Sequence, residues 1–120
     1  FYSPTLIAGV DENCMVSNVE PFGPIAATTP FDTVDQAIRL CNRLPFGLAS
    51  YVMTHDMRKA AAMTEGIEAG NVIVNHWQAS LPETPFGGHK DSGTGLEGGI
   101  EGLHAFQNVK YVSHFTSAEH

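Results

Sequence analysis

Hydrophobic and polar residues from Ile25 to Asn75 follow two alternating periodicities. Three short stretches rich in apolar, β-branched or aromatic residues indicate strands, at 25–31 (IAATTPF), 48–54 (LASYVMT) and 71–75 (NVIVN). The last of these is continuously apolar, which is typical of a strand buried on both faces of a parallel sheet.

Helices are predicted between these strands. Thr33 and Gln36 have the spacing of a capping box, so they mark the start of the first helix, which should end near Pro45 because the residue before a proline disfavours helical geometry. Asp56 is expected to cap the second helix, with Gly66 and Gly70 as its stop. The expected apolar faces consist of Val34, Ala37, Ile38 and Cys41 in the first helix and of Met57, Ala60, Ala61 and Ile67 in the second.

The resulting order, βαβαβ, predicts an α/β fold with parallel strands and right-handed crossovers. A further strand is expected at 5–10 (TLIAGV). Even with that strand, so small a sheet would leave two edges that need cover. The pattern therefore indicates a piece of a larger structure.

The texture changes after Asn75. Proline, glycine and polar residues continue to Gly95, and a short helix is expected at about 97–106. Residues 109–115 (VKYVSHF) then alternate in polarity, as in a strand laid on the edge of a sheet, for which a neighbouring subunit is one candidate.

Composition narrows the classes of function. The formal net charge of −7 gives no basic surface for nucleic acid or for anionic lipid, so neither partner is expected. No apolar run approaches the length of a membrane span, and the start of the chain lacks the layout of a signal peptide, so a cytoplasmic location is expected. The histidines and cysteines show no spacing typical of metal ligands, and no metal is expected. Cys41 is expected to be a small core group rather than half of a disulfide.

Two motifs favour structural roles. Pro-Phe-Gly occurs three times at unequal spacings, which favours separate tight turns over a repeat architecture. The run Gly93 to Gly98 matches G-x-G-x-x-G, yet it follows no strand and lies too close to the end of the sequence for the required acidic partner. No serine, cysteine or lysine has the neighbours of an activated nucleophile. The residues taken singly therefore indicate part of a parallel α/β fold and indicate no function.

Several segments taken together indicate a family more specifically than any single motif does. EPFGP (20–24), PFDT (30–33), FGLASYV (46–52), GNVIVN (70–75), PFGGHKDSGTGLEGG (85–99) and the terminal EGLHAFQNVKYVS resemble the aldehyde dehydrogenase superfamily, in order and with similar spacing. The resemblance covers essentially the whole sequence. It implies an NAD- or NADP-dependent oxidation of an aldehyde to a carboxylic acid through a cysteine thioester. It also implies that the nucleophilic cysteine, the general base and the cofactor domain lie upstream, so that no catalytic residue is expected in this chain.

The residues carried over from the resemblance are accessory ones. Glu20 matches a glutamate that hydrogen-bonds the nicotinamide ribose, and Phe22 matches an aromatic residue beside the nicotinamide ring. Ser80 and Phe86 match residues that line the aldehyde tunnel. Serine at position 80 is similar to the succinate-semialdehyde dehydrogenases, where it would bind the distal carboxylate. The alternative roles are a surface acid for Glu20 and an exposed loop serine for Ser80.

The resemblance also implies a division of the chain. Residues 1–106 would form the C-terminal part of a catalytic domain, and residues 107–120 would form an oligomerisation strand and a tail. That strand implies a homodimer or homotetramer.

Two other hypotheses stay open: a non-catalytic interaction module that kept this part of the fold, and one chain of a split dehydrogenase.

Overall fold

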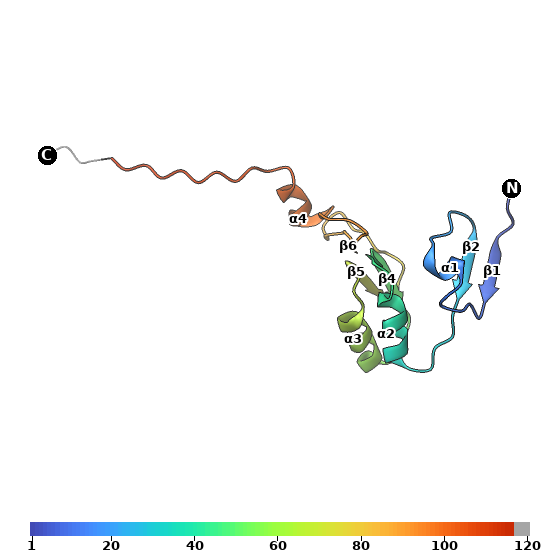
Figure 1. Cartoon of the computed structure of the whole chain (residues 1–120). Coiled ribbons are helices and arrows are strands. Elements are labelled where there is room, and N and C mark those ends of the chain that lie inside the picture. Colours follow the sequence, from blue (N-terminus) through green and yellow to red (C-terminus); the bar gives the residue numbers. More distant parts are fainter. Residues whose placement is uncertain (117–120) are drawn as a thin grey trace.

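The computed structural model describes residues 1–116, whose elements alternate between short strands and helices (Figure 1). In chain order these are β1 (Thr5–Ala8), α1 (Met15–Asn18), β2 (Ile25–Thr28), α2 (Val34–Asn42), β3 (Phe46–Gly47), β4 (Ala49–Val52), α3 (Met57–Gly66), β5 (Asn71–Val74), β6 (His89–Lys90) and α4 (Gly99–His104). The predicted order of strands and helices between Ile25 and Asn75 is confirmed, with the short β3 added before β4.

The strands of the described residues form three separate two-stranded sheets. β1 pairs with β2 and β4 pairs with β5, both in parallel, whereas β3 pairs with β6 in antiparallel orientation. The expectation that the strand at 25–31 shares a sheet with the next two was wrong. Its hydrogen-bonding partner is β1, and an extended segment carries the chain from β2 to α2, so that the β1–β2 pair stands apart from β4 and β5 (Figure 1).

Side-chain caps fix the starts of the two longer helices. The Thr33 hydroxyl accepts a hydrogen bond from the Gln36 backbone N–H at 3.1 Å, and the Gln36 side chain accepts one from the Asp32 N–H at 2.8 Å. The Asp56 carboxylate accepts from the N–H groups of Arg58 and Lys59. These bonds satisfy amide groups that have no partner within the helix. Both predicted caps are confirmed.

The helices α2 and α3 end where their side chains and glycines allow a close approach. α2 stops at Asn42, before Pro45, and the Asn42 amide group donates to the Gly66 carbonyl at 2.7 Å while its oxygen accepts from the Glu68 N–H at 2.8 Å. A side chain at Gly66 would meet Ile38 at 2.7 Å. Asn42 therefore fixes the end of α2 against the segment that leads from α3 into β5.

The hydrophobic core is small. Its buried members among the described residues are Val10, Ala37, Val52, Ala60, Ile67 and Ile73. Ala37 and Ala60 come from the facing sides of α2 and α3, and Val52 and Ile73 come from the paired strands β4 and β5. Three residues expected on the apolar helix faces are instead exposed: Cys41, Met57 and Ala61. The described part of this chain therefore covers only part of the apolar face of each helix.

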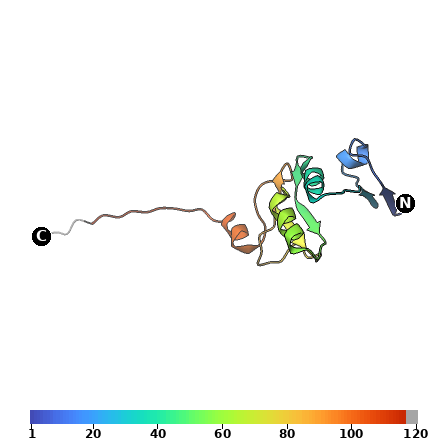
Figure 2. The same ribbon diagram turned by 90° about the horizontal axis from the view of Figure 1, so that it is seen from below.

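The chain exposes much more surface than a folded domain of its size. Its accessible surface is 9728 Å², whereas the scaling for folded monomers gives about 6,300 Å² at this mass. Its radius of gyration is 21.2 Å, against about 14 Å for a compact domain of this length. Figure 2 shows the cause: the N-terminal strand pair, the α2–α3 region and the C-terminal segment lie in a row.

The C-terminal segment has no regular secondary structure after α4. Residues 107–116 form no strand, so the strand expected at 109–115 is absent from the described chain. Val109 is fully exposed, and Tyr111 and Phe115 are each 89% exposed. An edge strand requires a neighbouring strand to pair with, and none of the strands between residues 1 and 116 lies beside the segment (Figure 1). The rest of the expected tail, 117–120, lies outside the described residues.

A substitution at Gly70 tests how closely the loop that contains Gly87 approaches the start of β5. A side chain at Gly70 would lie 1.9 Å from the Gly87 carbonyl oxygen, a backbone atom that cannot rotate away. We expect Gly70→Ala to lower the free energy of unfolding by about 1–3 kcal/mol through overpacking. The matched control is Gly23→Ala, because nothing lies within 4 Å of a side chain built there. Urea unfolding of the two variants gives the comparison, and equal midpoints would contradict the close approach.

Candidate functional site

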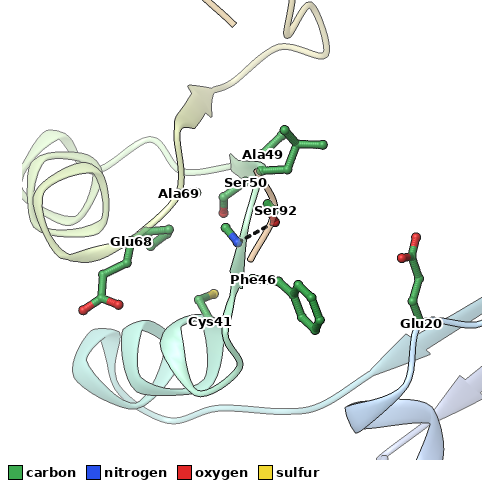
Figure 3. Close-up of a pocket in the computed structure, with 11 residues that line it drawn as sticks. Glu20, Cys41, Phe46, Ala49, Ser50, Glu68, Ala69 and Ser92 are labelled. Atoms are coloured by element: carbon green, nitrogen blue, oxygen red, sulfur yellow. Dashed lines mark hydrogen bonds between the residues drawn. The ribbon is translucent and has the colours of Figure 1, made fainter. Parts of the chain in front are cut away.

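Glu20 lies at the edge of a groove between the N-terminal segment and the α2–β4 region. The groove has a volume of about 390 Å³, and its lining includes Glu20, Cys41, Phe46 and Ser92. In Figure 3 Glu20 lies on the far side of Phe46 from Cys41, on the segment that leads to β2. Glu20 is exposed, so its carboxylate is available to a ligand in the groove.

Two arginines of the α2 region connect the Glu20 segment to the rest of the chain. Arg43 donates to the Asn18 side chain at 2.7 Å and to the Ser17 carbonyl, and Arg39 forms an ion pair with Glu12 at 2.9 Å. Asn18 in turn donates to backbone carbonyls of its own loop. The position of Glu20 relative to α2 therefore depends on polar contacts.

The turn that follows Glu20 is tight. The Gly23 N–H donates to the Pro21 carbonyl at 3.0 Å, and the Ile25 N–H donates to the Gly23 carbonyl at 2.8 Å. This turn projects Phe22 outward, where its side chain is 95% exposed. Phe22 does not line the groove that contains Glu20. The two predicted cofactor-binding residues are thus close in sequence but do not face the same groove.

Phe86 lines a second groove of about 310 Å³, together with Leu48, Ser92 and Leu96. Its backbone exchanges two hydrogen bonds with Glu97, each of 2.7 Å. Ser80 is exposed in the loop that precedes Phe86 and lines neither groove. The structure therefore places the two predicted substrate-binding residues on one loop without directing them to one groove.

The two grooves meet at Leu48 and Ser92, which line both. The Ser92 hydroxyl accepts a hydrogen bond from the Gly47 N–H at 2.9 Å. Sequence reasoning did not single out Ser92, although it belongs to the PFGGHKDSG run that contributed to the resemblance. Its proximity to Gly47 depends on the β3–β6 pairing, which brings together segments that are distant in sequence.

Lys90 joins the loop around Ser92 to the end of α2. It has a left-handed backbone with φ 55°, its ammonium group lies 2.5 Å from the Glu68 carboxylate, and it donates to the carbonyls of Asn42 and Leu44 at 3.3 and 3.5 Å. Carbonyls at the end of a helix carry partial negative charge, which a cation stabilises. These contacts fix the wall shared by the two grooves.

Cys41 faces the first groove and is not part of the core, which corrects the expectation from the sequence. Partial burial raises the pKa of the Cys41 thiol, because desolvation disfavours the thiolate. The thiolate is the nucleophilic form of cysteine. Cys41 therefore has the opposite of the environment that activates a nucleophile.

Among residues 1–116, no three side chains of the types that bind metals gather into a site. No helix in that part of the chain has both the length and the apolar character needed to cross a membrane.

Comparison with known proteins identifies the fold. Residues 1–112 match the model of the aldehyde dehydrogenase family, so the chain belongs to that family. It is 46% identical over 112 residues to 4-(hydroxymethyl)benzenesulfonate dehydrogenase of Comamonas testosteroni and 44% identical to succinate semialdehyde dehydrogenase of Acinetobacter baylyi. These matches cover 93% of this chain but only 24% and 23% of the relatives, so the chain spans about a quarter of their length.

Solved structures agree with this assignment. An aldehyde dehydrogenase from Mycobacterium tuberculosis, in complex with NAD+, superposes with a TM-score of 0.82 at 40% identity and covers 88% of this chain and 22% of its own. A succinate-semialdehyde dehydrogenase from Burkholderia pseudomallei superposes with a TM-score of 0.83 at 36% identity, covering 87% of this chain and 22% of its own. The predicted α/β class and the family resemblance are confirmed.

Proposed function

We propose that this chain is the C-terminal part of the catalytic domain of an NAD(P)-dependent aldehyde dehydrogenase, whose nucleophilic cysteine lies outside it. The observation that carries the proposal is the family match over residues 1–112 by a chain that spans only about a quarter of its relatives. The large exposed surface supports it, because the rest of a dehydrogenase would cover the apolar faces that this chain leaves open. Residues 1–106 belong to the catalytic domain in this proposal.

Glu20 and Phe22 each have the chemistry to contact one part of a nicotinamide cofactor, although they do not line the same groove in this chain. The exposed Glu20 carboxylate is able to accept two hydrogen bonds from the vicinal hydroxyls of a ribose. The Phe22 ring, 95% exposed, offers a flat apolar face to a planar ring. When bound, NAD or NADP supplies the acceptor for the hydride of the aldehyde. The role of this chain is to orient the cofactor, and the choice between NAD and NADP is assigned to residues outside it.

The proposed substrate is an aldehyde that carries an anionic group at its far end, such as a semialdehyde. Ser80 is exposed on the loop that leads to Phe86, and its hydroxyl is able to donate to a carboxylate. A polar group that is built to bind such an anion discriminates strongly, because an unpaired buried charge is costly. Relatives named as succinate semialdehyde and aspartate-semialdehyde dehydrogenases, 44% and 40% identical, support this substrate class.

The assembly and location follow from the same proposal. Residues 107–120 contain the oligomerisation strand, and the exposed side chains of Val109, Tyr111 and Phe115 would pack on a neighbouring subunit of a homodimer or homotetramer. The proposed location is the cytoplasm, where thiols stay reduced, and both Cys14 and Cys41 are unpaired.

The proposal is tested by comparing the natural protein that contains this chain with the 120-residue chain alone. With NAD or NADP and succinic semialdehyde, we expect steady formation of reduced cofactor by the natural protein and none by the chain, because the nucleophilic cysteine is assigned to the part of the protein outside it and desolvation disfavours the Cys41 thiolate. Absorbance of the reduced cofactor measures both. Turnover by the chain alone would contradict the location of the nucleophile.

The same experiment separates the alternatives. A natural protein that is no longer than this chain, forms a defined oligomer and ignores the cofactor would support a non-catalytic interaction module. Activity that appears only when a second polypeptide co-purifies would support a split dehydrogenase.

Glu20→Gln tests the cofactor role. The amide keeps the shape of the side chain but loses the charge that strengthens hydrogen bonds from the ribose hydroxyls. In the natural protein we expect the rate of hydride transfer to fall by about tenfold, with little change in the Michaelis constant for the aldehyde. Stopped-flow formation of reduced cofactor gives this rate, and Glu65→Gln, an exposed acid on α3, is the matched control. An unchanged rate at saturating cofactor would refute the assignment.

Ser80→Ala tests the substrate class. Loss of the hydroxyl should raise the Michaelis constant for a semialdehyde by roughly tenfold, the effect of removing a hydrogen bond to a charged group. The constant for an unsubstituted aldehyde of similar length should stay within about twofold. Ser80→Thr retains the hydroxyl and serves as the conservative control. Equal effects on the two aldehydes would remove Ser80 from substrate selection.

A further inference from the structure

The loop that carries Ser80 starts from a position that is fixed against the end of β4. Asn75 has a left-handed backbone with φ 60°, a conformation that asparagine tolerates better than most residues. Its side-chain oxygen accepts from the Thr54 N–H at 2.9 Å, and its amide group donates to the Thr54 carbonyl at 2.8 Å. Its own N–H donates to the Val52 carbonyl at 2.9 Å. These bonds set the direction in which the chain leaves β5.

The next contact with β4 is aromatic. The ring of Trp77 packs on the ring of Tyr51, with a distance of 5.5 Å between the ring centroids and an angle of 41° between the planes. This tilted arrangement lies within the range that aromatic pairs prefer. Tyr51 belongs to β4, so its position is set by the parallel pairing with β5. Trp77 is the only tryptophan in the chain.

Ser80 lies in sequence between this aromatic contact and the next hydrogen bond that joins the loop to another element. The Pro82 carbonyl accepts a hydrogen bond from the Gly99 N–H at 2.9 Å, which holds the second half of the loop near the start of α4. The bond that the Gln78 N–H donates goes to His76, within the loop itself. The path of the backbone to Ser80 is therefore determined by Trp77 on one side and by Pro82 on the other.

We propose that Trp77 is a positioning residue: its packing on Tyr51 holds the first half of the loop against β4 and thereby places Ser80 for the substrate. This inference rests on the proposed role of Ser80 in binding an aldehyde. Trp77 is 75% exposed, so the large ring contributes little to the core and its removal leaves the fold of β4 and β5 in place. The contact between the two rings instead increases the fraction of molecules in which the loop is ordered.

Proteolysis tests the ordering of the loop without any substrate. Glu83 is exposed in the same loop and is a site for a glutamyl endopeptidase. In the natural protein that contains this chain, we expect Trp77→Ala to accelerate cleavage after Glu83 by about two- to tenfold, the range set by an aromatic pair. Trp77→Phe retains a ring on Tyr51 and should cleave at close to the original rate. Gln78→Ala is the matched loop control, and melting temperatures verify that each variant is folded.

Kinetics test the consequence for the substrate. Trp77→Ala should raise the Michaelis constant for succinic semialdehyde by a similar factor, about two- to tenfold, with kcat nearly unchanged. Trp77→Phe should restore the original constant. Unchanged cleavage in Trp77→Ala would overturn the proposal, and a raised Michaelis constant without faster cleavage would instead indicate that the ring touches the substrate directly. Because cleavage needs no activity, absence of aldehyde oxidation would refute the proposed function and leave this contact to be judged by cleavage.

Discussion

The parallel pairing of β4 with β5 is the interaction on which the other contacts depend. Its register places Tyr51 opposite Ile73 and Val52 opposite Val74, so that the core of this region and the start of the Ser80 loop are set together. Asn71 extends the pairing with side-chain bonds to the carbonyls of Leu48 and Gly87. The strand pair thus fixes Ala49 and Ser50, which line the first groove, and the backbone next to Leu48, which lines both grooves.

Hydrogen bonds from side chains to backbone groups fix the segments next to these strands. Asn42 joins the end of α2 to the segment before β5, and Lys90 joins the loop after β6 to the same end of α2. Such bonds to backbone groups fix loops that have too little apolar surface to pack. The region around Ser92 is ordered in this way, although the buried core beneath it is small.

The small number of strands in each sheet explains why the chain is extended and exposes apolar surface. Large apolar side chains such as Leu6, Leu103 and Phe106 are exposed at 68%, 57% and 91%. A sheet with two strands covers neither its own edges nor the outer faces of its helices. In the proposed dehydrogenase, these surfaces would meet the rest of the protein.

The sequence by itself determined the order of strands and helices between Ile25 and Asn75 and the helix caps at Thr33 and Asp56, because caps and periodicity act over a few neighbouring positions. It also determined the family. The tertiary structure decided what depends on distant segments: that β2 pairs with β1 and not with β4, that Cys41 faces a groove, and that Ser92 joins the two grooves. It also showed that Phe22 does not line the groove that Glu20 lines, and it brought Trp77 onto Tyr51. Local patterns carry no record of which strand edges meet, since parallel pairing joins segments whose separation in sequence is set by the whole fold.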